Sequence, residues 1–338
     1  MQPINFGIIG AGRIGRVHAE SLTQRIPGAQ VSAVSDVILE AAQSCGRDFN
    51  IPNAYADHRT LLEDPAIDAV IICSSTDTHT QMIVEAAEAG KQIFCEKPIA
   101  LDLAAIDRAL ATVERCGVKL QIGFNRRFDS NFRHIRDTVA SGGIGTPQLV
   151  RITSRDPAPP PLSYLKVSGG IFLDMTIHDF DMARYLINDE VVEVYAAADA
   201  LVDPAIGEIG DVDTAVITLR YAGGAIGVID NSRKAVYGYD QRAEVLGSAG
   251  AIESQHKTAY NTVHSTANGL VAANPLYFFL ERYMDSYTAE LRAFMTAIQN
   301  NTPTPVTGLD GRIPVVIGLA AWQSVREHRP VRISEIGV

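Results

Sequence analysis

The chain has 338 residues, of which 46% are hydrophobic and 20% charged, and its net charge at pH 7 is −10. This length suggests two domains with a hydrophobic core each, and the composition excludes a disordered or fibrous protein. The acidic balance argues against nucleic acid or an anionic membrane surface as the main partner, because both attract basic proteins.

No apolar run approaches the roughly 20 residues that a membrane-spanning helix needs. The N-terminal residues enter a predicted strand at once, without a basic segment and an apolar core, so no secretory signal is expected. Four widely spaced cysteines form no CxxC pair; they are Cys45, Cys73, Cys95 and Cys116. We therefore expect a cytoplasmic protein with free thiols and no membrane partner.

The first third of the chain alternates short apolar runs with helical patterns. Strands are predicted at 4–9, 30–35, 69–73, 92–95 and 119–122, and helices at 13–25, 38–48, 79–89 and 102–116. This alternation indicates βαβ units and a parallel sheet with helices on both faces. We expect an α/β Rossmann domain over residues 1–122.

From about residue 145 the predicted strands are separated by turns. They lie at 148–153, 191–198, 214–221, 225–231 and 243–246, with helices at 170–187, 281–299 and 310–327. Consecutive strands of this kind form antiparallel pairs. We expect residues 123–338 to form an α+β domain with a large open, mainly antiparallel sheet, covered by helices on one face. The Pro-rich segment 156–161 is predicted to be a stiff loop.

A GxGxxG motif at residues 10–15 lies between the first predicted strand and its helix, the context that a dinucleotide-binding loop requires. Gly10 permits the tight turn, Gly12 lets the backbone approach a pyrophosphate, and Gly15 lets the helix pack on the strand. The start of the helix offers free N–H groups to phosphate. The predicted cofactor-binding residues of this loop are Gly10, Gly12, Arg13 and Ile14.

Asp36 ends the second predicted strand, where a carboxylate accepts hydrogen bonds from ribose hydroxyls and repels a 2′-phosphate. NAD is therefore expected rather than NADP. Ser74, Thr76 and His79 follow the strand predicted at 69–73, on the ligand side of a parallel sheet, and are candidates to line the cofactor. A surface turn with a capping residue is the alternative for each of these three.

Glu96, Lys97 and Pro98 follow the strand predicted at 92–95, again on the ligand side. Pro98 restricts Lys97 to extended backbone and so limits where its side chain points. Such a lysine is often only a solvated loop charge. Beside a nicotinamide it becomes a candidate catalytic residue, and we count Glu96 among the cofactor-binding residues.

The predicted helix 170–187 carries ionisable residues among apolar ones. Asp174 and His178 are four residues apart and Asp181 follows three residues later, so their side chains meet on one helical face. Burying such groups is costly unless they are paired or bind a polar ligand. Asp179 falls off this face and is expected to bind backbone or another side chain. A buried salt bridge or a capping cluster is the structural alternative to a site.

A metal site is the main rival for this cluster, because His and Asp both bind divalent ions. Lys97 would be a poor neighbour for a cation, and the chain has no HxxxH or HxH pair. Hydride transfer needs no metal when a lysine can stabilise the developing alkoxide. We therefore expect no metal.

The dinucleotide loop, Glu96-Lys97-Pro98 and Asp174-x-x-x-His178 together resemble the Gfo/Idh/MocA family of pyranose and cyclitol oxidoreductases, over essentially the whole chain. Residues 174–186, 231–250 and 278–294 look most like the bacterial inositol 2-dehydrogenase branch. The resemblance implies NAD-dependent oxidation of myo-inositol to 2-keto-myo-inositol by a homotetramer. The open sheet also leaves one face for another subunit to cover.

The chemistry fits the three residues that the resemblance makes catalytic. His178, with an unperturbed pKa near 6.5, suits the general base that takes the hydroxyl proton. Lys97 can stabilise negative charge on the oxygen, and Asp174 can orient the pair and stabilise the imidazolium. The cofactor accepts the hydride.

A cyclitol presents a ring of hydroxyls, so selectivity needs several placed polar groups. The candidate substrate-binding residues are Arg127, Asp156, Asp181, Tyr237 and Tyr283. All except Asp156 occupy substrate-contacting positions by resemblance. Asp156 departs from the family, because some relatives have HRNP where this chain has SRDP at 154–157, and the loop that follows is longer here.

Two alternatives remain open at this point. The first is the same chemistry on another cyclitol or sugar, such as scyllo-inositol, D-chiro-inositol or glucose. The second is a non-catalytic NAD-binding regulator, against which the intact set of Lys97, Asp174 and His178 argues.

Overall fold

The computed structural model describes residues 3–337, and the chain divides into two compact units. The first comprises Met1–Phe128 and Met284–Val315, and the second comprises Asp129–Tyr283 and Val316–Val338. The first break lies close to the boundary predicted at residue 122. The sequence did not predict that residues 284–315 return to the first unit.

The first unit contains a six-stranded parallel sheet of Rossmann type, as predicted. Its strands are β1 (Ile4–Ile9), β2 (Ala29–Ser35), β3 (Asn53–Tyr55), β4 (Ala69–Ile72), β5 (Gln92–Glu96) and β6 (Leu120–Gly123), in the order β3-β2-β1-β4-β5-β6. The chain order reverses between β1 and β4, which is where such sheets bind their ligands. The loops after these two strands are therefore the first to examine.

Helices flank this sheet. They are α1 (Arg13–Glu20, continued by a π-helical turn to Arg25), α2 (Leu39–Phe49), α3 (His58–Leu62), α4 (His79–Glu88) and α5 (Leu103–Cys116), with 3₁₀ turns at Thr76–Thr78 and Asn125–Phe128. Asp102 caps α5 by accepting a hydrogen bond from the Ala105 N–H at 2.8 Å. Gly117 ends the same helix in the left-handed conformation.

The hydrophobic core of the first unit explains why a C-terminal helix belongs to it. Phe6 and Phe94 are fully buried, and each ring lies near that of Phe294, at centroid distances of 6.4 and 6.0 Å. Phe294 lies in α11 (Phe279–Gln299), a helix whose residues from Met284 onward belong to the first unit. Aromatic burial of this kind contributes strongly to holding the segment in place.

The second unit is built on a seven-stranded sheet, open and mainly antiparallel as predicted. Its strands are β7 (Pro147–Arg155), β8 (Val191–Asp199), β9 (Thr214–Tyr221), β10 (Ile226–Ser232), β11 (Asp240–Gly247), β12 (Gly250–Ser254) and β15 (Val331–Arg332), in the order β12-β11-β7-β10-β9-β8-β15. Only β7 and β10 pair in parallel. The predicted turn at 222–224 joins β9 to β10.

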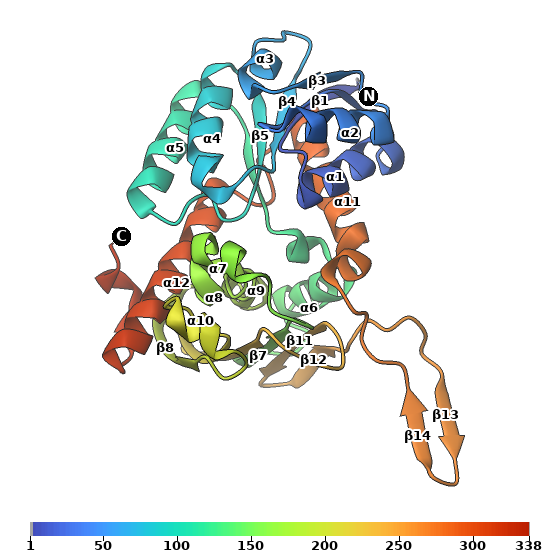
Figure 1. Ribbon diagram of the computed structural model, residues 1–338. Helices are drawn as coiled ribbons and strands as arrows, with labels where there is room; N and C mark the ends of the chain where they lie inside the picture. The colour runs from blue at the N-terminus through green and yellow to red at the C-terminus, as the bar shows by residue number, and fades with distance from the viewer. Residues whose placement is uncertain (1–2, 338) are drawn as a thin grey trace. The chain divides into compact units, whose positions relative to one another are not determined.

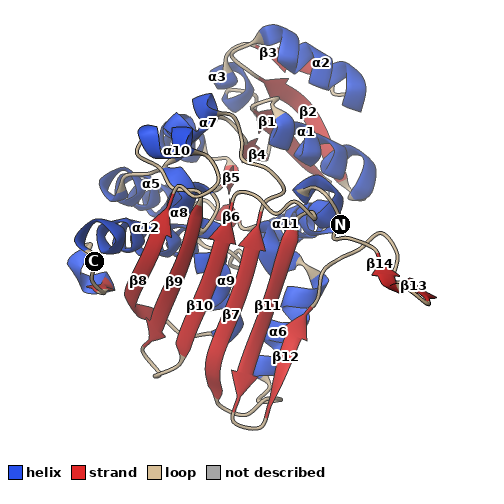
Figure 2. Cartoon of the chain, turned by 60° about the horizontal axis from the view of Figure 1, so that its bottom comes forward, coloured by secondary structure: helices blue, strands red, loops and turns tan. Residues whose placement is uncertain are grey.

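One face of this sheet is covered by helices and the other is not. Figure 2 shows α6 (Ser130–Ala140) and α9 (Ile177–Ile187) behind the strands, on the face turned from the viewer. Side chains on the uncovered face are 40–49% exposed although they are apolar; they are Val192, Tyr195, Val216, Ile226 and Leu246. The alternation along the strands therefore buries one row of apolar side chains and exposes another.

The remaining elements of the second unit are short, apart from α12 (Gly308–Glu327), whose first residues belong to the first unit. They are α7 (Leu162–Ser168), α8 (Gly170–Asp174), α10 (Pro204–Glu208), the 3₁₀ turn Ile333–Glu335, and a hairpin of β13 (Val263–Thr266) and β14 (Gly269–Ala272). The hairpin forms its own two-stranded sheet and is exposed along its length (Figure 1). No helix among the described residues is long and apolar enough to span a membrane.

Candidate functional site

The loop after β1 has the geometry that a dinucleotide requires. Gly10 has φ +101°, and a Cβ there would lie 2.6 Å from the carbonyl oxygen of Cys73, after β4. A Cβ on Gly15 would lie 1.9 Å from the carbonyl oxygen of Gly10. Both positions therefore exclude side chains, and the reason is close backbone packing.

Gly12 is different, because a Cβ there would meet nothing within 4 Å. It is exposed and forms the N-cap of α1, so the open space lies against the free N–H groups of the helix. Arg13, which is also exposed, and the half-buried Ile14 form the first turn. This space and these donors fit a pyrophosphate.

Asp36 shapes the same loop. One carboxylate oxygen accepts a hydrogen bond from the Ala11 N–H at 2.8 Å, and the other accepts from the Ile38 N–H at 2.9 Å. The carboxylate is thus held at the carboxyl end of β2 beside the glycine loop. Carboxylate oxygens have further lone pairs, so ribose hydroxyls can still donate to them.

The three candidates after β4 are placed differently from one another. The hydroxyl of Ser74 lies 2.7 Å from that of Thr78, and Thr76 opens the half-exposed 3₁₀ turn. His79 is 1% exposed and lies beneath this turn, with Nδ1 2.8 Å from the carbonyl oxygen of Pro98 and Nε2 3.1 Å from that of Ser74. The His79 ring therefore connects the loop after β4 to the loop after β5.

Burial lowers the pKa of the His79 imidazole, although both carbonyl oxygens favour the charged form. A neutral ring has one N–H to donate, and the shorter distance assigns it to Nδ1, toward Pro98. The structure brings Ser74 and Thr76 to the surface of the loop and His79 to its interior.

The segment after β5 carries Glu96, Lys97 and Pro98 at the predicted edge. Glu96 is 9% exposed, and its carboxylate lies 2.7 Å from Nε2 of His18 in α1. Lys97 is half-buried, and the peptide bond that joins it to Pro98 is cis. The sequence reasoning did not identify His18, because a histidine inside a helix pattern carries no local signal for a partner in β5.

In the second unit, the helix predicted at 170–187 is interrupted. It consists of α8, which ends at Asp174, and α9, which begins at Ile177. Between them the Thr176 N–H bonds to the carbonyl oxygen of Ile171, five residues back, and the Thr176 hydroxyl donates to Asn231 at 2.6 Å. The prediction of one continuous helix was wrong, so Asp174 and His178 lie in different helices.

Asp174 is held by two side chains from elsewhere in the unit. The Tyr164 hydroxyl donates to one carboxylate oxygen at 2.8 Å, and the guanidinium of Arg233 lies 3.4 Å from the other. Arg233 is 1% exposed and also lies 3.8 Å from Asp211. Burial and the Asp174 charge raise the pKa of the Tyr164 hydroxyl, so it stays a donor at neutral pH.

Asp211 in turn fixes the start of α8. It accepts a hydrogen bond from the Ile171 N–H at 2.9 Å, and burial raises the pKa of its carboxyl. Sequence reasoning missed Tyr164, Arg233 and Asp211. Arg233 lies within the segment 231–250, which was noted only for its resemblance.

The other acidic residues of α9 are buried. Asp179 is fully buried and accepts a hydrogen bond from the Asn231 side chain at 2.9 Å, so the prediction that it binds another side chain is confirmed. Asp181 is fully buried and His178 is half-buried.

The candidate substrate residues have defined surroundings. Arg127 donates to Asp310 at 3.0 Å within the first unit. In the second unit the backbone N–H of Asp156 donates to the Ser232 carbonyl at 2.9 Å, which holds the Pro-rich loop against β10. Tyr237 donates to Asp240 at 2.6 Å, and Tyr283 is 1% exposed, with its ring 4.5 Å below the Arg282 guanidinium.

Comparison with known proteins gives consistent results along the chain. Residues 4–124 match the model of an oxidoreductase family with an NAD-binding Rossmann fold, and residues 132–253 match the GFO/IDH/MocA C-terminal domain. The chain is 50% identical to the myo-inositol 2-dehydrogenase of Thermotoga maritima over 98% of its length and 99% of the relative. It is 43% identical to the inositol 2-dehydrogenase of Rhizobium meliloti, again over 98% and 99%.

A solved structure extends the comparison to bound ligands. The scyllo-inositol dehydrogenase of Lactobacillus casei, solved with NAD(H) and scyllo-inositol, superimposes with a TM-score of 0.92 at 29% identity. The match covers 98% of this chain and all of the other.

Proposed function

The chain belongs to the Gfo/Idh/MocA family of oxidoreductases, and from that premise we propose that it is an NAD-dependent inositol 2-dehydrogenase acting on myo-inositol. The observation that carries the proposal is the 50% identity to a myo-inositol 2-dehydrogenase over nearly the full length of both chains. The product is 2-keto-myo-inositol (scyllo-inosose).

The reaction breaks one C–H bond and one O–H bond of a secondary alcohol. The hydride passes to the nicotinamide of NAD, which becomes NADH, and a C=O bond forms. His178 takes the hydroxyl proton as general base, and Lys97 stabilises the negative charge that develops on the oxygen. Asp174 orients the base and stabilises the imidazolium.

The surroundings of Asp174 support this last role. A carboxylate that accepts from Tyr164 and lies against buried Arg233 has a fixed position. Fixed charge is what electrostatic catalysis requires, because the site then needs no reorganisation during the reaction.

The glycine loop and Asp36 support NAD as the cofactor. The bare space at Gly12 admits a pyrophosphate, and the Asp36 carboxylate would repel the extra phosphate of NADP. The further cofactor-binding residues in this proposal are Arg13, Ile14, Ser74, Thr76, His79 and Glu96. Of these, His79 and Glu96 act from the interior by holding the loops that line the cofactor. The substrate contacts are Arg127, Asp156, Asp181, Tyr237 and Tyr283.

One alternative keeps support, namely the same oxidation of a different inositol isomer. It is favoured by the likeness to a scyllo-inositol dehydrogenase and by the departure at Asp156. Values of kcat/KM for myo-inositol, scyllo-inositol, D-chiro-inositol and glucose, each with NAD and NADP, separate the two. Preference for myo-inositol with NAD is expected, whereas preference for glucose or for NADP would overturn the proposal.

The catalytic assignment is tested by Lys97→Ala and His178→Ala. Both are expected to lose turnover while NAD binding, measured by calorimetry, stays near wild type. Retained turnover in either variant contradicts its role. If the wild type forms no NADH with any polyol, the chain is instead a non-catalytic NAD-binding regulator.

We also propose that the enzyme is a cytoplasmic homotetramer. The apolar row on the uncovered sheet face supports assembly, since monomers seldom expose so many apolar side chains on one surface. A monomeric mass by light scattering at assay concentration would defeat this part.

A further inference from the structure

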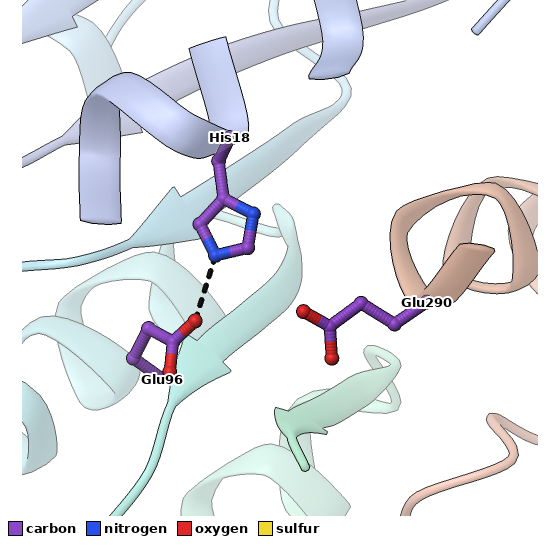
Figure 3. A group of neighbouring side chains, drawn as sticks. All are labelled: His18, Glu96 and Glu290. Atoms are coloured by element: carbon purple, nitrogen blue, oxygen red, sulfur yellow. Dashed lines mark hydrogen bonds and ion pairs between the residues drawn. The ribbon is translucent and has the colours of Figure 1, made fainter. Parts of the chain in front are cut away.

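Three ionisable side chains meet inside the first unit. His18 comes from α1, Glu96 from the end of β5 and Glu290 from α11, and Figure 3 shows the Glu290 carboxyl group directed toward the other two. Their ligand atoms lie within 4.8 Å of one another. His18 and Glu290 are fully buried, and Glu96 is 9% exposed.

Aromatic rings close one side of this cluster. The His18 ring packs edge-on against Phe94 and Tyr287, at centroid distances of 5.1 and 5.7 Å. A Cβ at Gly123 would lie 3.0 Å from the carboxyl carbon of Glu96, so a side chain there would push against that carboxylate. The cluster is therefore closely packed.

Glu290 differs from Glu96 in its partners. Glu96 lies 2.7 Å from Nε2 of His18, whereas neither carboxyl oxygen of Glu290 has a hydrogen-bond partner among the described residues. The groups that face it from other elements are Glu96, His18 and the Cys73 thiol, whose pKa is itself raised by burial and by these carboxylates. None of these groups supplies a fixed positive charge to Glu290.

Two anions here would be unfavourable, because a buried carboxylate without a partner is costly and a like charge nearby adds repulsion. Burial and the Glu96 charge raise the pKa of the Glu290 carboxyl well above its ordinary range. Both effects favour the protonated form of Glu290.

A divalent metal ion is the other occupant that two glutamates and a histidine could hold. A metal-ligating histidine almost always donates its second ring N–H to an acceptor. Nδ1 of His18 is buried without a hydrogen-bond partner among the described residues, so the ring lacks the acceptor that a metal-ligating histidine would use. His18 also bonds Glu96 directly through the other nitrogen.

We propose that Glu290 is a permanently protonated carboxylic acid which, with His18, positions Glu96 and through it the adjacent Lys97. This inference rests on the catalytic role proposed for Lys97. Glu96 is the last residue of β5 and Lys97 follows it directly, so holding Glu96 in the cluster fixes the point at which the chain leaves the strand toward Lys97. An ionised Glu290 would repel Glu96 and displace the end of β5.

The protonation state is tested without any activity. Infrared spectroscopy of the wild type at neutral pH is expected to show the C=O band of a buried carboxylic acid, and Glu290→Gln should lack it. Absence of that band from the wild type overturns the proposal. Elemental analysis of the purified protein is the second test, and one bound divalent ion that Glu290→Gln loses would assign a metal site instead.

Stability against pH gives an independent measurement. The folded chain keeps the Glu290 proton where the unfolded chain, with an ordinary pKa of 4.5, has lost it. The free energy of unfolding from this group therefore falls as pH rises above about 4.5. Glu290→Gln should lack this fall, whereas the exposed control Glu88→Gln should keep it. Equal slopes in wild type and Glu290→Gln contradict the proposal.

Kinetics test the positioning role. Glu290→Ala is expected to lower kcat about tenfold or more with little change in NAD affinity, because small misplacements of catalytic groups are costly. Glu290→Gln should recover most of the wild-type kcat, whereas Glu96→Gln should keep a lowered kcat. If Glu290→Gln is as impaired as Glu290→Ala, the positioning role is wrong. If the wild type oxidises no polyol, the proposed function fails, while the infrared and stability results still decide the protonation of Glu290.

Discussion

Replacing Arg233 with methionine removes the cation that lies between Asp174 and Asp211 while keeping most of the side-chain volume. Arg233 is 1% exposed, and the two carboxylates are 13% and 6% exposed. Removing one partner of a buried ion pair costs about 3–5 kcal/mol, because the remaining charge stays buried.

The distances favour the lower end of that range. The guanidinium lies 3.4 Å from Asp174 and 3.8 Å from Asp211, longer than the 2.7–2.9 Å typical of strong charged hydrogen bonds. We therefore expect Arg233→Met to lower the free energy of unfolding of the second unit by about 3 kcal/mol, roughly a hundredfold in the unfolding equilibrium.

The single tryptophan makes this loss measurable. Trp322 lies in α12, its ring is 4.9 Å from that of Phe172 in α8, and its indole N–H donates to Gly169 at 3.4 Å. Its fluorescence during guanidinium unfolding thus reports on the region next to Asp174. The midpoint should shift with little change in slope.

Arg329→Met is the matched control, because Arg329 is 43% exposed and pairs with Glu327 and Glu335. Exposed pairs contribute about 0–1 kcal/mol, so this variant should unfold near wild type. A loss of less than about 1 kcal/mol for Arg233→Met, indistinguishable from the control, would refute the assignment of a buried charge network around Asp174.

Three further outcomes are expected. Gly10→Ala should abolish NAD binding by calorimetry, since its Cβ meets backbone, whereas Gly90→Ala, with φ +73° and open space, should still bind NAD. Asp36→Ala should weaken the binding of NAD about tenfold or more, because a charge-assisted hydrogen bond to ribose is lost. It should also reduce the ratio of kcat/KM with NAD to kcat/KM with NADP. Val216→Lys, on the uncovered sheet face, should lower the mass measured by light scattering. Leu201→Lys, on an exposed loop, is the control and should leave that mass unchanged. An unchanged mass in Val216→Lys would show that this sheet face is not the subunit interface.

Local periodicity predicted most of the strands and helices, because each pattern lies within a single element. The strand β1 was placed at Ile4–Ile9 and β9 at Thr214–Tyr221, and both are observed there. β3 was missed because Asn53–Tyr55 is three residues long and incompletely buried. The break at Thr176 was missed because it depends on a bond to Asn231 in β10, which helical spacing cannot reveal.

Some features of the candidate site could likewise be predicted from the sequence, and others could not. The glycine loop and Asp36 are contiguous signals, and the structure gives them the expected geometry. Asp174 lies against Arg233, and Glu96 lies near Glu290, and both neighbours come from distant parts of the chain. Such pairs have no sequence period, so only the folded arrangement reveals them.

The bond from the Ala11 N–H to Asp36 has a consequence for redesign of the cofactor site. The same carboxylate that is suited to discriminate between the two dinucleotides also fixes the shape of the glycine turn. A change of coenzyme by substitution at this one position would therefore loosen the turn that both coenzymes need. A successful switch requires a neutral acceptor that still satisfies Ala11, introduced together with a cation for the added phosphate.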